Sequence, residues 1–185
     1  MTTGRLRVYI ACSLDGFIAG TDSDLSWLPG ADGGTADADS GDAITYGQFM
    51  GDVGAMLMGR QTYDVVSGFG GPWPYGDTPV LVATHRALED APDSVQAVSG
   101  DFSDLVAQAL TRAGGKDVYL DGGALVRQAL ELDLVDQAIV TVVPVILGEG
   151  VPLFAGLRQR KAMQFDAVHR YGEMVQWVLS RATTV

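Results

Sequence analysis

Cysteine is almost absent from this chain of 185 residues, and Cys12 is its one example. A lone cysteine forms no intramolecular disulfide and supplies no cysteine-based zinc site, so no metal centre is expected. Its neighbours Ile10 and Ala11 indicate an inert strand residue.

Basic residues are also scarce, because 12 Lys and Arg stand against 23 Asp and Glu and leave a net charge of −11. Nucleic acids need a basic surface, so they are excluded as partners. The negative field also repels phosphorylated cofactors. If such a cofactor binds, individual arginines and helix N-termini must hold its phosphates.

Long apolar runs are missing as well. The N-terminus lacks the apolar core of a signal peptide, and no uncharged apolar stretch reaches membrane-spanning length. We therefore expect a soluble, cytoplasmic protein with no membrane partner. The hydrophobic content of 47% and the length of 185 residues are those of one packed domain, residues 1–185.

The chain does contain alternating strand and helix patterns, followed by a closing hairpin. Strands are expected at residues 6–13, 53–58, 79–83, 117–120 and 136–147, helices at 43–50, from 62 onward, 102–113 and 124–132, and the hairpin at 162–171 and 174–181. This order predicts a three-layer α/β/α sandwich with a mostly parallel central sheet and antiparallel C-terminal strands.

Two segments are expected to be irregular loops. Residues 21–42 are rich in Asp, Gly and Ser around Trp27, and long loops of this kind often act as lids. Residues 68–76 read GFGGPWPYG, which excludes regular structure. This second loop either closes over a ligand with Trp73 and Tyr75 or forms a subunit contact, and the sequence leaves both open.

Three polar segments follow predicted strands. In Met58-Gly59-Arg60-Gln61-Thr62, a helix start presents backbone N–H groups to an anion, Thr62 can cap the helix and bind phosphate, and Arg60 can pair with a phosphate. A capped helix with a solvated arginine explains the same residues equally well.

In the second segment, Asp121-Gly122-Gly123, two glycines allow a sharp turn and a close approach to a pyrophosphate, although tight turns also use glycine for geometry alone. In the third, Thr84-His85-Arg86, Arg86 is either a loop cation or a partner for a ribose 2′-phosphate. Ligands of open α/β sheets bind beyond the carboxyl ends of the strands, where all three segments are expected.

Four motifs in order along the chain resemble the dihydrofolate-reductase-like superfamily. They are Ser13-x-Asp15-Gly16-x-Ile18, Met58-Gly59-Arg60-x-Thr62-Tyr63, Asp121-Gly122-Gly123 and Pro144-x-x-Leu147-Gly148-x-Gly150-x-x-Leu153-Phe154. The branch that the chain resembles most is the reductase domain of the bifunctional riboflavin-biosynthesis deaminase/reductase and its stand-alone relatives. The resemblance covers nearly the whole chain.

The resemblance implies a bound NADPH. Ala11 and Ile18 are then expected to line the nicotinamide. Gly59, Arg60 and Thr62 are expected to hold phosphates, and Thr84 and Arg86 are expected at the 2′-phosphate. The pyrophosphate is expected to be held by Gly122, Gly123, Ala124, Leu125 and Val126. Arg60 and Arg86 favour NADPH over NADH, because the extra phosphate needs cationic partners.

The resemblance also implies hydride transfer to a small substrate, which requires a proton donor. Asp15, at the end of the first strand, is the expected catalytic residue, and Asp39 or Asp42 are alternatives within the long loop. Trp27, Phe49 and Thr141 are expected around the substrate, although core packing also explains Phe49.

The leading interpretation is an NADPH-dependent reductase of a pyrimidine, a pterin or a flavin-related heterocycle, active as a homodimer. A non-catalytic nucleotide-binding module that keeps the cofactor cradle is the alternative from another class, and a flavoprotein is a third. A homodimer would also cover the apolar residues of the last strand, Met174 to Leu179.

Overall fold

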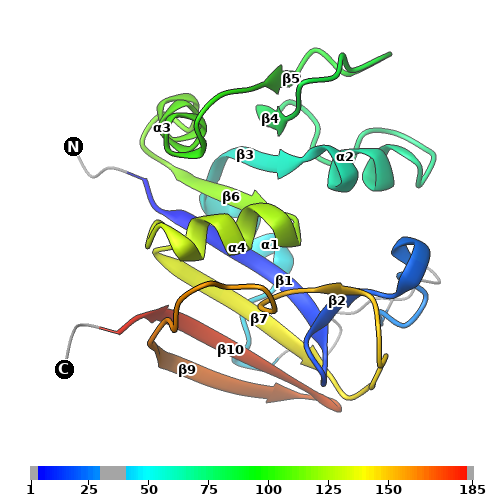
Figure 1. Cartoon of the computed structure of the whole chain (residues 1–185), viewed down its shortest axis with the longest axis vertical. Helices are drawn as coiled ribbons and strands as arrows, with labels where there is room; N and C mark the ends of the chain where they lie inside the picture. Colours follow the sequence, from blue (N-terminus) through cyan, green and yellow to red (C-terminus); the bar gives the residue numbers. More distant parts are fainter. Residues whose placement is uncertain (1–3, 30–40, 183–185) are drawn as a thin grey trace.

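The computed structural model describes residues 4–29 and 41–182. One large sheet of eight strands runs through the molecule (Figure 1). In order across the sheet, the strands are β5 (Val95–Val98), β4 (Val80–Ala83), β3 (Val53–Gly59), β6 (Asp117–Asp121), β1 (Leu6–Ser13), β7 (Gln137–Val143), β10 (Met174–Arg181) and β9 (Met163–Tyr171). The first six strands are parallel, and the last two are antiparallel, as the sequence predicted.

Helices cover both faces of this sheet. Helices α3 (Phe102–Arg112) and α4 (Gly123–Glu131) pack on one face, and α1 (Tyr46–Asp52) and α2 (Arg60–Ser67) pack on the other. Figure 1 shows α4 in front of β6 and β1, with α1 behind them. The predicted three-layer α/β/α architecture is therefore confirmed.

The alternation of side chains along each strand creates two apolar cores. In β6, Val118 and Leu120 point toward α3 and α4, whereas Tyr119 joins the core beneath α1 and α2. These three residues are at most 6% exposed, so the middle of this central strand is packed on both faces. Strands buried on both faces are typical of parallel sheets whose helices cover both sides.

Several element boundaries differ from the sequence prediction. Strand β7 ends at Val143 rather than at residue 147, because Pro144 has no N–H to donate to the ladder. Helix α2 begins at Arg60, two residues before the expected start. Strand β5 was not predicted, because its four residues include the polar Gln96 and only Val98 is buried. A small second sheet pairs β2 (Phe17–Ala19) with β8 (Val151–Pro152), and a 3₁₀ turn, η1 (Thr21–Ser23), follows β2.

The expectation that the last strand exposes its apolar residues is wrong. Strand β10 lies inside the sheet, paired with β7 on one side and β9 on the other, and its Val178 and Leu179 are buried. The exposed apolar side chains belong to the neighbouring edge strand, where Phe165 is 61% and Val168 is 57% exposed.

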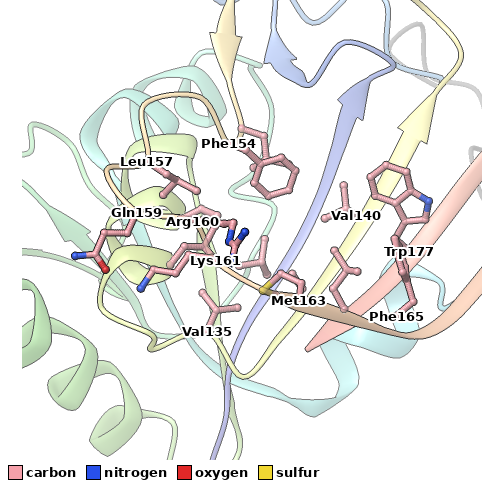
Figure 2. A pocket seen from close by; sticks show the side chains of 16 residues that line it. Val135, Val140, Phe154, Leu157, Gln159, Arg160, Lys161, Met163, Phe165 and Trp177 are labelled. Atoms are coloured by element: carbon pink, nitrogen blue, oxygen red, sulfur yellow. The ribbon is translucent and has the colours of Figure 1, made fainter. Parts of the chain in front are cut away.

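An apolar cavity of about 360 Å³ lies beside this edge (Figure 2). Its walls include Val126 and Leu130 of α4, Phe154 after β8, and Trp177 on β10. Apart from Gln159, Arg160 and Lys161, the lining residues are apolar, so the cavity suits an apolar partner better than a polar heterocycle. Among the described residues, no helix is both long and apolar enough to cross a bilayer.

Candidate active site

The three polar segments meet at one edge of the sheet. Strands β4, β3 and β6 run parallel and adjacent, with Gly59 opposite Ala83 and Met58 opposite Asp121. The residues that follow these strands therefore leave the sheet at the same carboxyl edge, where ligands of open α/β sheets bind. The topology brings together the segments that the sequence placed 20 to 60 residues apart.

Helix α2 begins at this edge without a side-chain cap. Its N-cap is Gly59, and no side chain accepts a hydrogen bond there, so the expected capping role of Thr62 is wrong. Thr62 instead directs its hydroxyl oxygen toward the turn at Gly122. The amides of the first turn of an α-helix have no intrahelical acceptor, which makes them available to an anion.

Two arginines near this helix start differ in their partners and in their exposure to solvent. Arg60 donates through Nε to Asp64 at 2.7 Å and through Nη1 to the carbonyl oxygen of Ala87 at 2.9 Å. The side chain of Arg86 is 71% exposed, and its Nη2 lies 3.8 Å from Asp64. The Thr84 hydroxyl accepts from the backbone N–H of Arg86 at 3.0 Å and fixes that turn. Arg86 is thus the more accessible cation for an added phosphate.

The turn into α4 brings backbone unusually close to its neighbours. Gly122 has φ +100°, which favours glycine, and an added Cβ would lie 2.5 Å from the Thr62 hydroxyl oxygen. At Gly123 an added Cβ would lie 2.9 Å from Cδ1 of Ile18 and 3.1 Å from the carbonyl oxygen of Pro152. This cradle of bare backbone fits the requirements of a pyrophosphate at a helix N-terminus.

The expected contact of Val126 with the cofactor needs correction. Val126 is 2% exposed, its side chain packs in the core, and its N–H donates to the carbonyl oxygen of Gly122 at 3.0 Å. Leu125 is also packed in that core, so only its backbone can face a ligand. The available part of the cradle is therefore the bare backbone of Gly122 to Leu125, with free N–H groups at Gly123, Ala124 and Leu125, because the N–H of Gly122 donates to Asp121.

Asp15 is held as an anchor between two loops. Its carboxylate accepts from the Ser13 hydroxyl at 2.6 Å and from the backbone N–H groups of Gly148 at 2.7 Å and Leu147 at 3.1 Å. The bond from Ser13 and the two backbone bonds lower the pKa of Asp15 to about 2. A carboxylate held ionised by three donors is a poor source of a proton, so the geometry does not favour Asp15 as the catalytic acid.

Asp121 has the opposite environment at the end of β6. Burial raises the pKa of its carboxyl to about 6, although the N–H of Gly122 donates to it at 2.8 Å and acts in the opposite direction. Burial and the charge of Asp121 together raise the pKa of Tyr46 to about 12. Burial, together with the charge of Asp121, likewise raises the pKa of Tyr75. A carboxyl with this pKa can hold and release a proton near neutral pH.

The expected substrate residues lie at different depths. Phe49 is completely buried, with its ring centroid 4.9 Å from that of Tyr9 and 5.0 Å from that of Tyr119, so packing is its role and the substrate contact is corrected. Thr141 is 6% exposed and lies opposite Ala11 in the sheet. Trp27 is half-buried and donates to the carbonyl oxygen of Asp24 at 3.2 Å.

The alternative proton donors in the long loop gain no support. Asp42 is an exposed turn residue, and Asp39 lies outside the described residues. The described part of that loop is linked to the cofactor edge, because Gln61 of α2 donates to the Ser23 hydroxyl at 3.1 Å. In residues 4–29 and 41–182 no group of three or more His, Cys, Asp or Glu side chains is placed to hold a metal ion.

The sequence analysis quoted Asp121 only as part of a turn and assigned no role to Tyr46 or Gln176. Gln176 of β10 is fully buried and makes two hydrogen bonds to the backbone of Ile44, at 2.8 and 3.0 Å, which fix the chain just before Tyr46. An acidic residue followed by two glycines after a buried strand was the available signal for Asp121. No local pattern connects it with tyrosines about 45 and 75 residues earlier in the chain.

The layers, the strand order and the glycine turn define a dihydrofolate-reductase-like α/β protein. The RibD C-terminal domain model matches residues 73–177, which is more than half of the chain. The protein therefore belongs to the RibD C-terminal domain family, to which reductase domains of riboflavin biosynthesis belong.

Individual proteins resemble this chain over nearly its whole length. The uncharacterized protein YwjB of Bacillus subtilis (strain 168) is 34% identical over 180 residues, which are 95% of this chain and 97% of that protein. A putative riboflavin biosynthesis protein from Shewanella sp. PV-4 has a similar structure, with a TM-score of 0.81, 30% identity, and coverage of 97% of this chain and 99% of that one.

A more distant structure shares the fold. It is the diaminohydroxyphosphoribosylaminopyrimidine deaminase/5-amino-6-(5-phosphoribosylamino)uracil reductase of Thermotoga maritima, with a TM-score of 0.69 and 14% identity. The alignment covers 97% of this chain but 57% of that chain.

Proposed function

We propose that this protein is an NADPH-dependent reductase of a small heterocyclic compound, acting as one domain. The observation that carries the proposal is the pairing of two uncapped helix starts, at Gly59 and Gly122, beside a carboxyl whose pKa is raised to about 6. The first feature suits a dinucleotide, and the second suits proton transfer. Membership in a family of reductase domains supports the same conclusion.

In this proposal each part of the edge has one task. The backbone of Gly122 to Leu125 holds the pyrophosphate, the first turn of α2 holds a second phosphate, and Ala11 and Ile18 face the nicotinamide. Arg86, with Thr84 fixing its turn, meets the 2′-phosphate. When bound, NADPH supplies a hydride to an electrophilic carbon of the substrate.

Asp121 is the proposed proton donor of the same reaction. Reduction of a C=N or C=O bond needs one proton on the nitrogen or oxygen beside the carbon that accepts the hydride. A buried carboxyl keeps its proton to higher pH than an exposed one, and the adjoining phenols of Tyr46 and Tyr75 limit contact with water. The Thermotoga relative acts on a phosphoribosylaminouracil, which favours a pyrimidine over a pterin or a flavin-related substrate.

The alternative is a nucleotide-binding module without turnover. Such a module needs no proton donor, whereas Asp121 offers one beside the two helix starts. An NADPH fluorescence titration and the oxidation of NADPH at 340 nm distinguish the two functions. We expect binding together with oxidation when 5-amino-6-(5-phosphoribosylamino)uracil or dihydrofolate is added. Binding with no oxidation by either compound would favour the module.

Cofactor preference is tested at Arg86. We expect Arg86→Ala to weaken NADPH binding about tenfold while the Kd for NADH changes less than twofold, because an exposed arginine–phosphate pair contributes roughly 1–2 kcal/mol. Arg112→Ala is the control, since that arginine bonds to Gln96 and lies on α3. An equal loss for both cofactors would place Arg86 at a shared phosphate.

We also propose a cytoplasmic homodimer, with the contact moved from β10 to the face at β9. Phe154, Phe165 and Val168 are exposed there beside the apolar cavity, and a second copy would remove them from water. Phe165→Glu is expected to give monomers in sedimentation velocity at about 10 µM protein, whereas Gln128→Glu, on the exposed side of α4, stays dimeric. A monomeric wild-type protein would remove this proposal.

A further inference from the structure

The segment after α2, residues 68–76, folds back over the face that carries Asp121. Trp73 packs against Tyr63 of α2 with ring centroids 5.7 Å apart and against Tyr75 at 5.2 Å in an edge-to-face arrangement. Tyr75 and Tyr46 both lie near Asp121, and burial, followed by the charge of Asp121, raises the pKa of both tyrosines. The segment therefore forms an aromatic wall beside the proposed proton donor.

The indole nitrogen of Trp73 stands out within this wall. Its N–H is buried, and no hydrogen-bond acceptor lies within reach of it among the described residues. Leaving a buried donor without a partner costs about 1–3 kcal/mol, so such groups call for an explanation. By contrast, Tyr119 next to the same site donates its hydroxyl to the carbonyl oxygen of Tyr9 at 2.9 Å.

Three glycines of the segment have backbone conformations that L side chains rarely adopt. Gly70, Gly71 and Gly76 have φ values of +74°, +85° and +52°, and nothing lies within 4 Å of an added Cβ at any of them. These glycines flank the Pro-Trp-Pro-Tyr sequence on both sides, so a small change of dihedral angles on each side moves Trp73 and Tyr75 as one unit.

We propose that Trp73 is a substrate-recognition residue, whose indole N–H donates to a carbonyl oxygen of a flat heterocyclic ring held between the aromatic segment and Asp121. This inference rests on the proposed function. A ring of this kind suits the site because its face packs on aromatic side chains, its carbonyl oxygen accepts from Trp73, and its N–H groups donate to the phenol oxygens. Bound substrate thus satisfies the donor that the closed segment leaves without a partner.

The test replaces Trp73 with phenylalanine, which keeps an aromatic ring and removes the N–H. The probe is 5-amino-6-(5-phosphoribosylamino)uracil at saturating NADPH. We expect its KM to rise about tenfold, the cost of one hydrogen bond, with the Kd for NADPH within twofold of wild type. The unfolding temperature is expected to stay the same or to rise, because the variant buries no unsatisfied donor. Trp177→Phe, on the other face of the sheet in the apolar cavity, is the matched control and should leave KM unchanged.

Each result separates the inference from the proposed function. A wild-type protein that binds no NADPH contradicts both. A protein that binds NADPH, with a KM for Trp73→Phe within twofold of wild type, contradicts the inference alone, as does failure of wild type to bind the uracil compound. A lowered unfolding temperature together with weaker NADPH binding would assign Trp73 to packing and overturn the recognition role.

Discussion

Gly123→Val is expected to raise the Kd for NADPH at least a hundredfold, which corresponds to about 2.7 kcal/mol of binding free energy. The side chain would enter a space where even a Cβ lies 2.9 Å from Ile18 and 3.1 Å from the Pro152 carbonyl oxygen. Relief requires movement of the β2–β8 pair or of the α4 start, and either one displaces the backbone N–H groups that are proposed to hold the pyrophosphate. Fluorescence titration with NADPH measures the loss.

The control for this prediction is Gly51→Val in α1. Gly51 is also helical, and nothing lies within 4 Å of an added Cβ there, so the same chemical change occurs without a clash. Overpacking at Gly123 is expected to lower the free energy of unfolding by about 1–3 kcal/mol, and the far-ultraviolet circular dichroism should remain that of a folded α/β protein. Unchanged NADPH affinity in folded Gly123→Val would contradict the glycine cradle.

Asp121→Asn is expected to lower kcat by roughly a hundredfold to a thousandfold, the usual contribution of a general acid. With a pKa of about 6, the protonated fraction of Asp121 falls tenfold for each pH unit above that value. The kcat/KM of the wild type should therefore decline above about pH 6, and that of the variant should be low and independent of pH in this range. NADPH binding should be retained, because the variant keeps the size of the side chain.

The effect of pH on stability provides a second measurement at Asp121. Folding raises the pKa of this carboxyl from 3.8 to about 6, so its stabilising contribution is complete below about pH 4 and is lost as the pH rises through 6. Asp121→Asn lacks this pH-dependent contribution to stability. The stability of the variant relative to wild type should therefore increase between pH 4 and pH 7, as measured by urea unfolding.

Asp15→Asn decides between the two candidate acids. The pKa of Asp15 is lowered to about 2, so its contribution to stability is present above about pH 4 and is lost as the pH falls toward 2. The variant should be less stable than wild type at pH 7 and should retain the decline of kcat/KM above pH 6. If that decline disappears in Asp15→Asn and persists in Asp121→Asn, the acid is Asp15.

Local sequence patterns were sufficient where the structural cause is local. The apolar strand 6–13 and the hairpin strands were located within a residue or two, because alternation and turn residues act between near neighbours. The glycine turn before α4 was recognised for the same reason. Boundaries failed where a single residue decided them, as Pro144 did for β7 and Gly59 did for the start of α2.

The site shows the same division between near and distant causes. Ser13 and Asp15 were correctly seen as a turn, but the backbone of residues 147 and 148, more than 130 positions away, makes Asp15 an anchored anion. Asp121 appeared to be a turn residue until α1 and segment 68–76 placed Tyr46 and Tyr75 beside it. Hydrogen bonds and desolvation set a carboxyl's pKa, and both depend on neighbours in space.

The sequence by itself determined the layers, the longer strands and helices, and the three segments that reach the carboxyl edge of the sheet, because hydrophobic periodicity and glycine conformations are encoded locally. Only the tertiary structure decided which carboxyl keeps a proton, which arginine stays accessible and which tryptophan has no partner. These properties depend on burial and on distances between groups that the fold brings together from distant parts of the chain.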